Sequence, residues 1–146
     1  MQLAQINIAR MLAPLESAAM REFRGFLAPV NMLAERSPGF VWRYSDLNAG
    51  IFVLPWDDEF LIVNMSVWKD VDSLRRFTHH TVHAYFMNSR NKWFHQLDHP
   101  YSVLWWVKDG YIPTLNEGKA KLALLEKNGP SLDAFPFQQA ESFQWK

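Results

Sequence analysis

The chain has 146 residues, a length that suits one domain with a single core, and it has no cysteine, which excludes disulfides and thiolate metal sites. Its formal net charge is zero with acidic and basic residues interspersed, which excludes the basic surface typical of nucleic-acid or anionic-lipid binding. The start lacks the features of a signal peptide and no apolar run reaches the length of about 18 residues that a membrane span needs, so we expect a cytoplasmic protein with one domain over residues 1–146.

The first half of the chain predicts a strand, a helix and a second strand. Apolar and polar residues alternate over residues 3–12, which is the pattern of a half-buried strand. Apolar residues then recur at helical spacing up to Arg36, after Ser17 as the N-cap. A turn at residues 37–39 leads into a strand whose alternation predicts three aromatic rings on one face, namely Phe40, Trp42 and Tyr44.

The third strand is the clearest in the chain. Over residues 61–67 one face is wholly apolar, while Asn64 and Ser66 interrupt the other face. A helix follows over about residues 71–94, with a break near Thr78. The second face of the strand therefore looks at partly polar surroundings.

The last part of the chain predicts a fourth strand and an extra helix. Residues 101–107 form the strand, and the capping box at residues 114–117 begins the helix. The sequence Asn128-Gly129-Pro130 ends it. Phe135 and Phe137 predict a short edge strand, and the tail from about residue 138 reads as irregular.

The order of these elements is strand, helix, strand, strand, helix, strand, followed by one helix. This order predicts an α+β fold of ferredoxin-like type, a split βαβ arrangement with an antiparallel sheet and an extra C-terminal helix. Such a sheet has helices on one face, so the other face needs a cover. We expect a homodimer in which a second copy supplies it, with the last helix or the tail as the alternative cover.

A resemblance to a known family is carried by residues 7–10, 37–43, 63–68, 93–94, 103–107, 129–130 and 134–135. In this order the segments resemble an uncharacterised bacterial family, the domain of unknown function 3291, which is grouped with the dimeric α+β barrels. The resemblance implies the fold and the dimer rather than an activity. The wider superfamily includes cofactor-free antibiotic biosynthesis monooxygenases, haem-degrading enzymes and isomerases, so it is an analogy for function.

Candidate catalytic residues lie on the second helix. Seven residues of that helix fall at spacings of three, four and seven and so share one face, namely His79, His83, Phe86, Met87, Arg90, Trp93 and Phe94. We expect His79, Phe86 and Met87 to contact the ligand there. A histidine there can act as an acid or base, and Arg90 can hold a carboxylate, enolate or phenolate. The alternative is that His83 is a core histidine bonded to backbone and that Arg90 either pairs with a carboxylate or extends its charged end to solvent.

The aromatic content of 15%, with seven tryptophans, calls for a place to put the rings. An aromatic core or dimer interface is one interpretation, and a ligand cavity is the other. Trp42 and Trp106 are the tryptophans that we expect to line such a cavity. Arg10 and Asn64 are polar residues expected to point inward, Asn64 as a stabiliser of an oxyanion, although a strand end or a neighbouring loop also accounts for them.

The sequence predicts no metal site. His79 and His83 have the spacing at which two imidazoles hold one ion, but no third ligand follows in helical register. We expect no cofactor, with haem on a helical histidine as the alternative.

We therefore expect an enzyme that acts on a small hydrophobic or aromatic metabolite in an aromatic-lined cavity. Its chemistry would be histidine acid/base chemistry of the monooxygenase, isomerase or cyclase type, as used in biosynthetic pathways. The nucleophile elbow and the glycine-rich phosphate loop are absent, so the reaction classes that need them are excluded. The alternatives are a non-catalytic dimer that binds a small ligand or acts as a scaffold, and a haem-binding protein.

Overall fold

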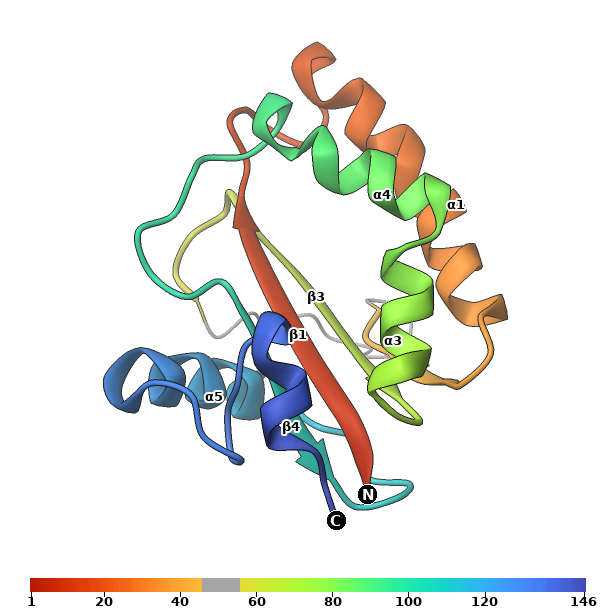
Figure 1. Ribbon diagram of the computed structural model, residues 1–146. Coiled ribbons are helices and arrows are strands. Elements are labelled where there is room, and N and C mark those ends of the chain that lie inside the picture. The colour runs from red at the N-terminus through yellow and green to blue at the C-terminus, as the bar shows by residue number, and fades with distance from the viewer. Residues whose placement is uncertain (46–55) are drawn as a thin grey trace.

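The computed structural model describes residues 1–45 and 56–146. Its centre is a four-stranded antiparallel sheet in the order β2-β3-β1-β4 (Figure 1). This is the strand order of a ferredoxin-like α+β fold, so the predicted fold class is confirmed. The strands are β1 (Gln2–Arg10), β2 (Phe40–Arg43), β3 (Leu61–Trp68) and β4 (Ser102–Val107).

The second helix is broken after Thr78, where the sequence predicted a break, and it ends at Asn88 rather than near residue 94. His79 caps α3 through its backbone N–H, and the chain turns before α4 begins, as Figure 1 shows. The prediction that His79, His83 and Arg90 share one helix face is therefore wrong. The helices are α1 (Arg21–Arg36), α3 (Val71–Thr78), α4 (Thr81–Asn88) and α5 (Leu115–Asn128), with 3-10 turns η1 (Ala18–Met20), η2 (Arg90–Lys92) and η3 (Phe137–Phe143).

The sheet has two differently covered faces. On the first, which we call the α1/α3 face, Leu3 and Trp68 pack with Ala34 of α1 and Leu74 of α3. On the second, the α5 face, the apolar side of β3 predicted from sequence packs against α5. The residues buried there include Ile6, Met65, Val67, Leu122 and Leu125. The expectation that helices cover only one face is therefore wrong, and the alternative of the last helix as a cover describes the structure.

A glycine allows α5 to approach the sheet closely. A Cβ atom at Gly118 would lie 2.5 Å from Cδ1 of Ile6 in β1. The helix begins directly after Thr114, because the Thr114 hydroxyl accepts a hydrogen bond from the backbone N–H of Glu117, at 3.1 Å. The predicted N-cap thus fixes where the helix starts, and Gly118 fixes how near it lies to β1.

A register shift in β2 separates the three aromatic residues predicted to share one face. Phe40 lies opposite Trp68 and packs on it edge-on, with ring centroids 5.5 Å apart on the α1/α3 face. The register then shifts between Phe40 and Trp42, so that Trp42 and Tyr44 pack on the α5 face instead. The single-face prediction is wrong because a bulge inserts a residue, which a strict period of two does not anticipate.

The tail is ordered and covers part of the α1/α3 face. Phe135 forms the expected edge contact as a bridge with Leu104 of β4, and Phe135 and Ala140 are buried. Residues 137–143 form η3 rather than an irregular segment. Trp106 donates its indole N–H to the carbonyl oxygen of Phe143 at 2.8 Å, which ties η3 to β4. Among the described residues, none of the helices combines the length and apolar character that crossing a membrane requires.

Candidate functional site

Polar residues cross the middle of the α1/α3 face from strand to strand. The strand register aligns Ser102, Asn7 and Asn64 in one row across β4, β1 and β3, and it aligns Gln5 with Ser66 in the next row. We call these five residues the polar strip. Apolar clusters flank it, with Leu3 and Trp68 on one side and Ala9 and Ile62 on the other. A polar break in an otherwise apolar face is costly unless its groups are bonded or used.

The polar strip is held by side-chain hydrogen bonds. Gln5 donates from Nε2 to Oδ1 of Asn64 at 2.8 Å and to the hydroxyl oxygen of Ser66 at 2.7 Å. Its own carbonyl oxygen accepts from Nδ2 of Asn7 at 3.3 Å. Trp68 donates its indole N–H to the Ser66 hydroxyl at 2.8 Å. Four of the five strip residues, Gln5, Asn7, Asn64 and Ser66, therefore form one connected network that is anchored in the buried Trp68.

The strip is open at its Asn7 and Asn64 end. Both residues sit on the two central strands, yet both side chains are exposed, whereas Gln5 and Ser66 are only 6% exposed. Side chains at the centre of a sheet are normally covered by the helices on that face. The helices therefore leave this part of the face accessible to a small molecule.

His83 lies on the same face, next to the ring of Phe77, which in turn stacks on Trp68. The Phe77 ring stacks on Trp68 with centroids 5.1 Å apart, and the His83 ring lies 4.7 Å from Phe77. Nδ1 of His83 is 3.2 Å from the carbonyl oxygen of Thr78. Because a carbonyl oxygen only accepts, Nδ1 carries the proton and Nε2 carries the lone pair in the neutral ring.

Burial lowers the pKa of His83 below its ordinary value, and the hydrogen bond to Thr78 opposes this in part. The imidazole is therefore neutral at neutral pH, which is the protonation state of a general base. The same arrangement fits the alternative of a core histidine bonded to backbone, so the geometry of this residue alone does not separate the two roles.

The lowered pKa of His83 predicts a dependence of stability on pH. As pH falls below about 6.5, the unfolded chain binds a proton at this histidine and the folded chain does not, so the free energy of unfolding decreases. The slope from this one group is at most about 1.4 kcal/mol per pH unit and ends below the folded-state pKa. Chemical denaturation between pH 5 and about 7.5, in the original chain and in His83→Gln, measures it. Equal slopes in both proteins would contradict the lowered pKa.

Arg90 lies outside α4, over the ring of Tyr101. It begins η2, and its guanidinium carbon lies 4.5 Å from the ring centroid of Tyr101. Tyr101 immediately precedes Ser102 of the strip, and its carbonyl oxygen accepts from the N–H of Ile8. The structure thus gives Arg90 a cation–π contact rather than the carboxylate of the alternative interpretation. Its predicted role as an anion holder stays a prediction.

The other residues predicted on the second helix are dispersed. His79 is the exposed C-cap of α3, and Met87 is 41% exposed near the end of α4. The side chain of Phe86 lies outside the described ones. The ligand-binding roles of these three residues stay predictions.

Arg10 and Trp106 have partners of their own. Arg10 forms an ion pair with Asp58 at 3.0 Å and lies over the ring of Phe60. Trp106 is on the α1/α3 face, in the apolar row beyond the polar strip, and is tied to η3. The ligand-binding roles predicted for Arg10 and Trp106 stay predictions.

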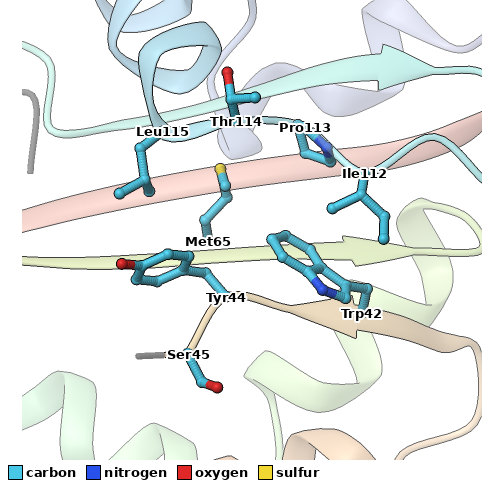
Figure 2. Close-up of a pocket in the computed structure, with 8 residues that line it drawn as sticks. All are labelled: Trp42, Tyr44, Ser45, Met65, Ile112, Pro113, Thr114 and Leu115. Atoms are coloured by element: carbon cyan, nitrogen blue, oxygen red, sulfur yellow. The ribbon is translucent and has the colours of Figure 1, made fainter. Parts of the chain in front are cut away.

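Trp42 lines a different cavity, on the α5 face (Figure 2). Trp42 of β2 and Tyr44, which follows β2, form an aromatic wall, and the loop before α5 forms an aliphatic wall facing it, with Met65 between them. We call this cavity the aromatic slot; its volume is about 380 Å³. The remaining lining residues are Ser45, Ile112, Pro113, Thr114 and Leu115. The predicted site residues are thus divided between two faces of the sheet.

Metal ligands do not cluster in the described ranges 1–45 and 56–146. No group of three or more His, Asp or Glu side chains lies close enough there to hold an ion. The expectation that the protein binds no cofactor stays a prediction, which measurements on the purified protein test.

Fold and polar strip together define a ferredoxin-like α+β protein with an accessible polar site on the helix-bearing face of its sheet. The chain belongs to the family described as domain of unknown function DUF3291, which it matches over residues 2–145. The predicted family membership is confirmed. No curated protein matches the sequence.

Solved structures of similar fold share little sequence with this chain. A protein of unknown function from Nitrosomonas europaea, NE2512, is 16% identical, with 77% of this chain and 95% of that chain covered and a TM-score of 0.52. SnoaB, a cofactor-independent oxygenase from Streptomyces nogalater, is 18% identical, with 74% and 94% covered and a TM-score of 0.49. PA3566 from Pseudomonas aeruginosa is 16% identical, with 70% and 88% covered and a TM-score of 0.46. At these identities a likeness concerns the fold alone.

Proposed function

We propose that this protein is an enzyme that moves protons on a small hydrophobic or aromatic metabolite bound over the polar strip. His83 acts as the base through Nε2, and the side-chain amide of Asn64 donates to the oxygen on which negative charge develops. The observation that carries the proposal is that a neutral, partly buried imidazole and an exposed amide lie on the same face of the sheet.

The surroundings support a substrate with an aromatic or otherwise apolar body. The partly buried Phe77 ring lies next to His83 and stacks on the buried Trp68, and the strip offers amide groups where the helices leave it open. Arg90, over the ring of Tyr101, is proposed to hold a carboxylate or phenolate of the substrate. The chemical step we propose is transfer of a proton from a carbon or oxygen acid of the substrate to Nε2 of His83. The resulting enolate or phenolate oxygen accepts a hydrogen bond from the Asn64 amide.

The second candidate function is binding without catalysis, in the aromatic slot. The slot has a volume in the range of small-molecule sites, and its facing aromatic and aliphatic walls suit a flat apolar ring. Among the described residues its lining holds no histidine, carboxylate or basic residue, so these residues support binding rather than proton transfer. The haem alternative stays a prediction, and the absorption spectrum of the purified protein tests it.

Two matched variants separate the candidates. Thermal shifts are measured for a panel of phenols, aromatic ketones and aromatic acids with their amides. We expect compounds with an acceptor oxygen to raise the melting temperature, and we expect Asn64→Ala to abolish the rise while Ile112→Ser, at the rim of the slot, keeps it. The reverse pattern would favour binding in the slot. Equal shifts for acids and their amides would remove the anion-holding role from Arg90.

We also propose that the chain forms a homodimer. Apolar residues at the edge of the sheet and at the rim of the slot are exposed, including Val41 at 40%, Tyr111 at 46% and Ile112 at 55%. Exposed apolar side chains that gather in one region are typical of protein interfaces. Light scattering at micromolar concentration is expected to give twice the mass of the chain, and the mass of one chain would contradict the proposal.

A further inference from the structure

Gln5 is the centre of the polar strip. It lies on the central strand β1, between Ser66 of β3 and Leu104 of β4, and it is only 6% exposed. Its side-chain amide takes part in three of the hydrogen bonds of the strip. A buried amide in such a network is expected to use its groups fully, because an unsatisfied donor there is costly.

Both amide hydrogens of Gln5 are committed. One is donated to Asn64 and the other to Ser66, whose hydroxyl also accepts from the indole N–H of Trp68. A glutamine amide has two donors, so neither hydrogen remains for a ligand. Gln5 is buried as well, and it therefore acts on a bound molecule only through its neighbours.

The bond to Gln5 determines which end of the Asn64 amide faces outward. Oδ1 of Asn64 is held toward Gln5 at 2.8 Å, so the amide nitrogen is turned away from Gln5. Among the described residues no acceptor lies on that nitrogen, and the side chain is exposed. At the open end of the strip, Asn64 therefore presents an N–H donor, whereas Asn7, whose Nδ2 donates to Gln5, presents its carbonyl oxygen.

We propose that Gln5 is a positioning residue that fixes the direction of the Asn64 amide, so that a ligand places an acceptor oxygen, and not a donor, at Asn64. The ligand class is an aromatic or apolar molecule with a phenolate, enolate or carbonyl oxygen at this end. This inference rests on the proposed function, since it assumes that ligands bind over the strip. It adds the residue, Gln5, that determines which ligand group binds at Asn64.

The first experiment tests the orientation without a ligand. Side-chain amide signals of Asn64 and Gln5 are assigned in nitrogen-15 spectra by comparison with Asn64→Asp and Gln5→Met, and their hydrogen exchange with water is measured. We expect slow exchange for the Gln5 amide and fast exchange for the Asn64 amide. Slow exchange at Asn64 with fast exchange at Gln5 would mean the opposite polarity of the network and would overturn the inference.

The second experiment tests selectivity with two probes of similar shape. The dissociation constants of 4-nitrophenol, at a pH where it is ionised, and of nitrobenzene are measured for the original chain and for Gln5→Met. Methionine keeps the unbranched shape without a donor, so we expect nitrophenolate binding to weaken by about tenfold or more, as for the loss of a bond to a charged oxygen, and nitrobenzene binding to stay within about twofold. Equal weakening of both probes would show a structural role and overturn the inference.

A control variant accounts for lost stability. Ser73→Ala removes a buried hydroxyl that bonds to Asp70 at the start of α3, away from the strip, and it is expected to leave both dissociation constants unchanged. If neither probe binds the original chain, the proposed function fails while the amide exchange still decides the orientation of Asn64. Probe binding that Gln5→Met does not affect would instead leave the proposed function intact and contradict the role of Gln5.

Discussion

Replacement of His83 by glutamine is expected to lower turnover by about 10²-fold or more while the protein stays folded. Glutamine can donate to the carbonyl oxygen of Thr78 as the imidazole does, but it has no group that titrates near neutral pH. The free energy of unfolding at pH 7 is therefore expected to change by less than about 1 kcal/mol. Denaturant unfolding measures the stability, and until a substrate is known, the ligand-induced thermal shift reports on the site.

The structural role of His83 makes the opposite demand on the same variant. If His83 serves only the packing against Phe77, His83→Gln leaves a poorly matched buried group and costs up to about 3 kcal/mol. Activity per folded molecule would then survive. A stable variant with full activity would contradict the proposed base.

Truncation of Trp68 to alanine is expected to cost about 3–5 kcal/mol of unfolding free energy. The ring is fully buried, packs on Phe40 and Phe77, and donates to Ser66. Because Phe77 in turn contacts His83, the loss also removes the ring support of the proposed base. Trp68→Phe keeps a ring there and is expected to cost about 1–2 kcal/mol.

Denaturant unfolding of both Trp68 variants measures these values, with Trp145→Ala as the matched control. Trp145 is 49% exposed, so the same truncation there is expected to change stability by less than about 0.5 kcal/mol. A loss below about 1 kcal/mol in Trp68→Ala would contradict the view that this tryptophan anchors both the core and the polar strip.

The fold was predictable because the strands of this chain carry strong signals. The apolar face of β3 and the alternation in β1 identify the two central strands, and the capping box places the start of α5. The bulge in β2 was not predictable, since nothing in the alternation of Phe40 and Trp42 marks an inserted residue. Which face α5 covers was also open, because a helix pattern does not name its neighbour.

The candidate site was predictable in part. Asn64 was found because it interrupts an apolar face, and His83 because it lies on an apolar stripe of helix. Gln5 was missed, although it alternates with apolar residues in β1 as Ser66 does in β3. The signal that could have found it is the antiparallel register, which brings Gln5 opposite Ser66 and Asn7 opposite Asn64.

Arg90 shows the limit of helical spacing as a guide to a site. One heptad separates it from His83, which predicts a shared face only if the helix continues. Here α4 ends at Asn88, and Arg90 begins η2 beside Tyr101. Single-residue breaks of this kind depend on tertiary packing and are hard to see in a sequence.

The most direct test of the central claim is the location of a bound aromatic probe. Nitrogen-15 spectra recorded during titration with 4-nitrophenol, at a pH where it is ionised, report on side-chain amides and indole groups across the molecule. The account predicts saturable shifts at the side-chain amides of Asn64 and Gln5, with none at the indole of Trp42 in the aromatic slot. Shifts at Trp42 with unchanged signals at Asn64 would contradict a site on the polar strip.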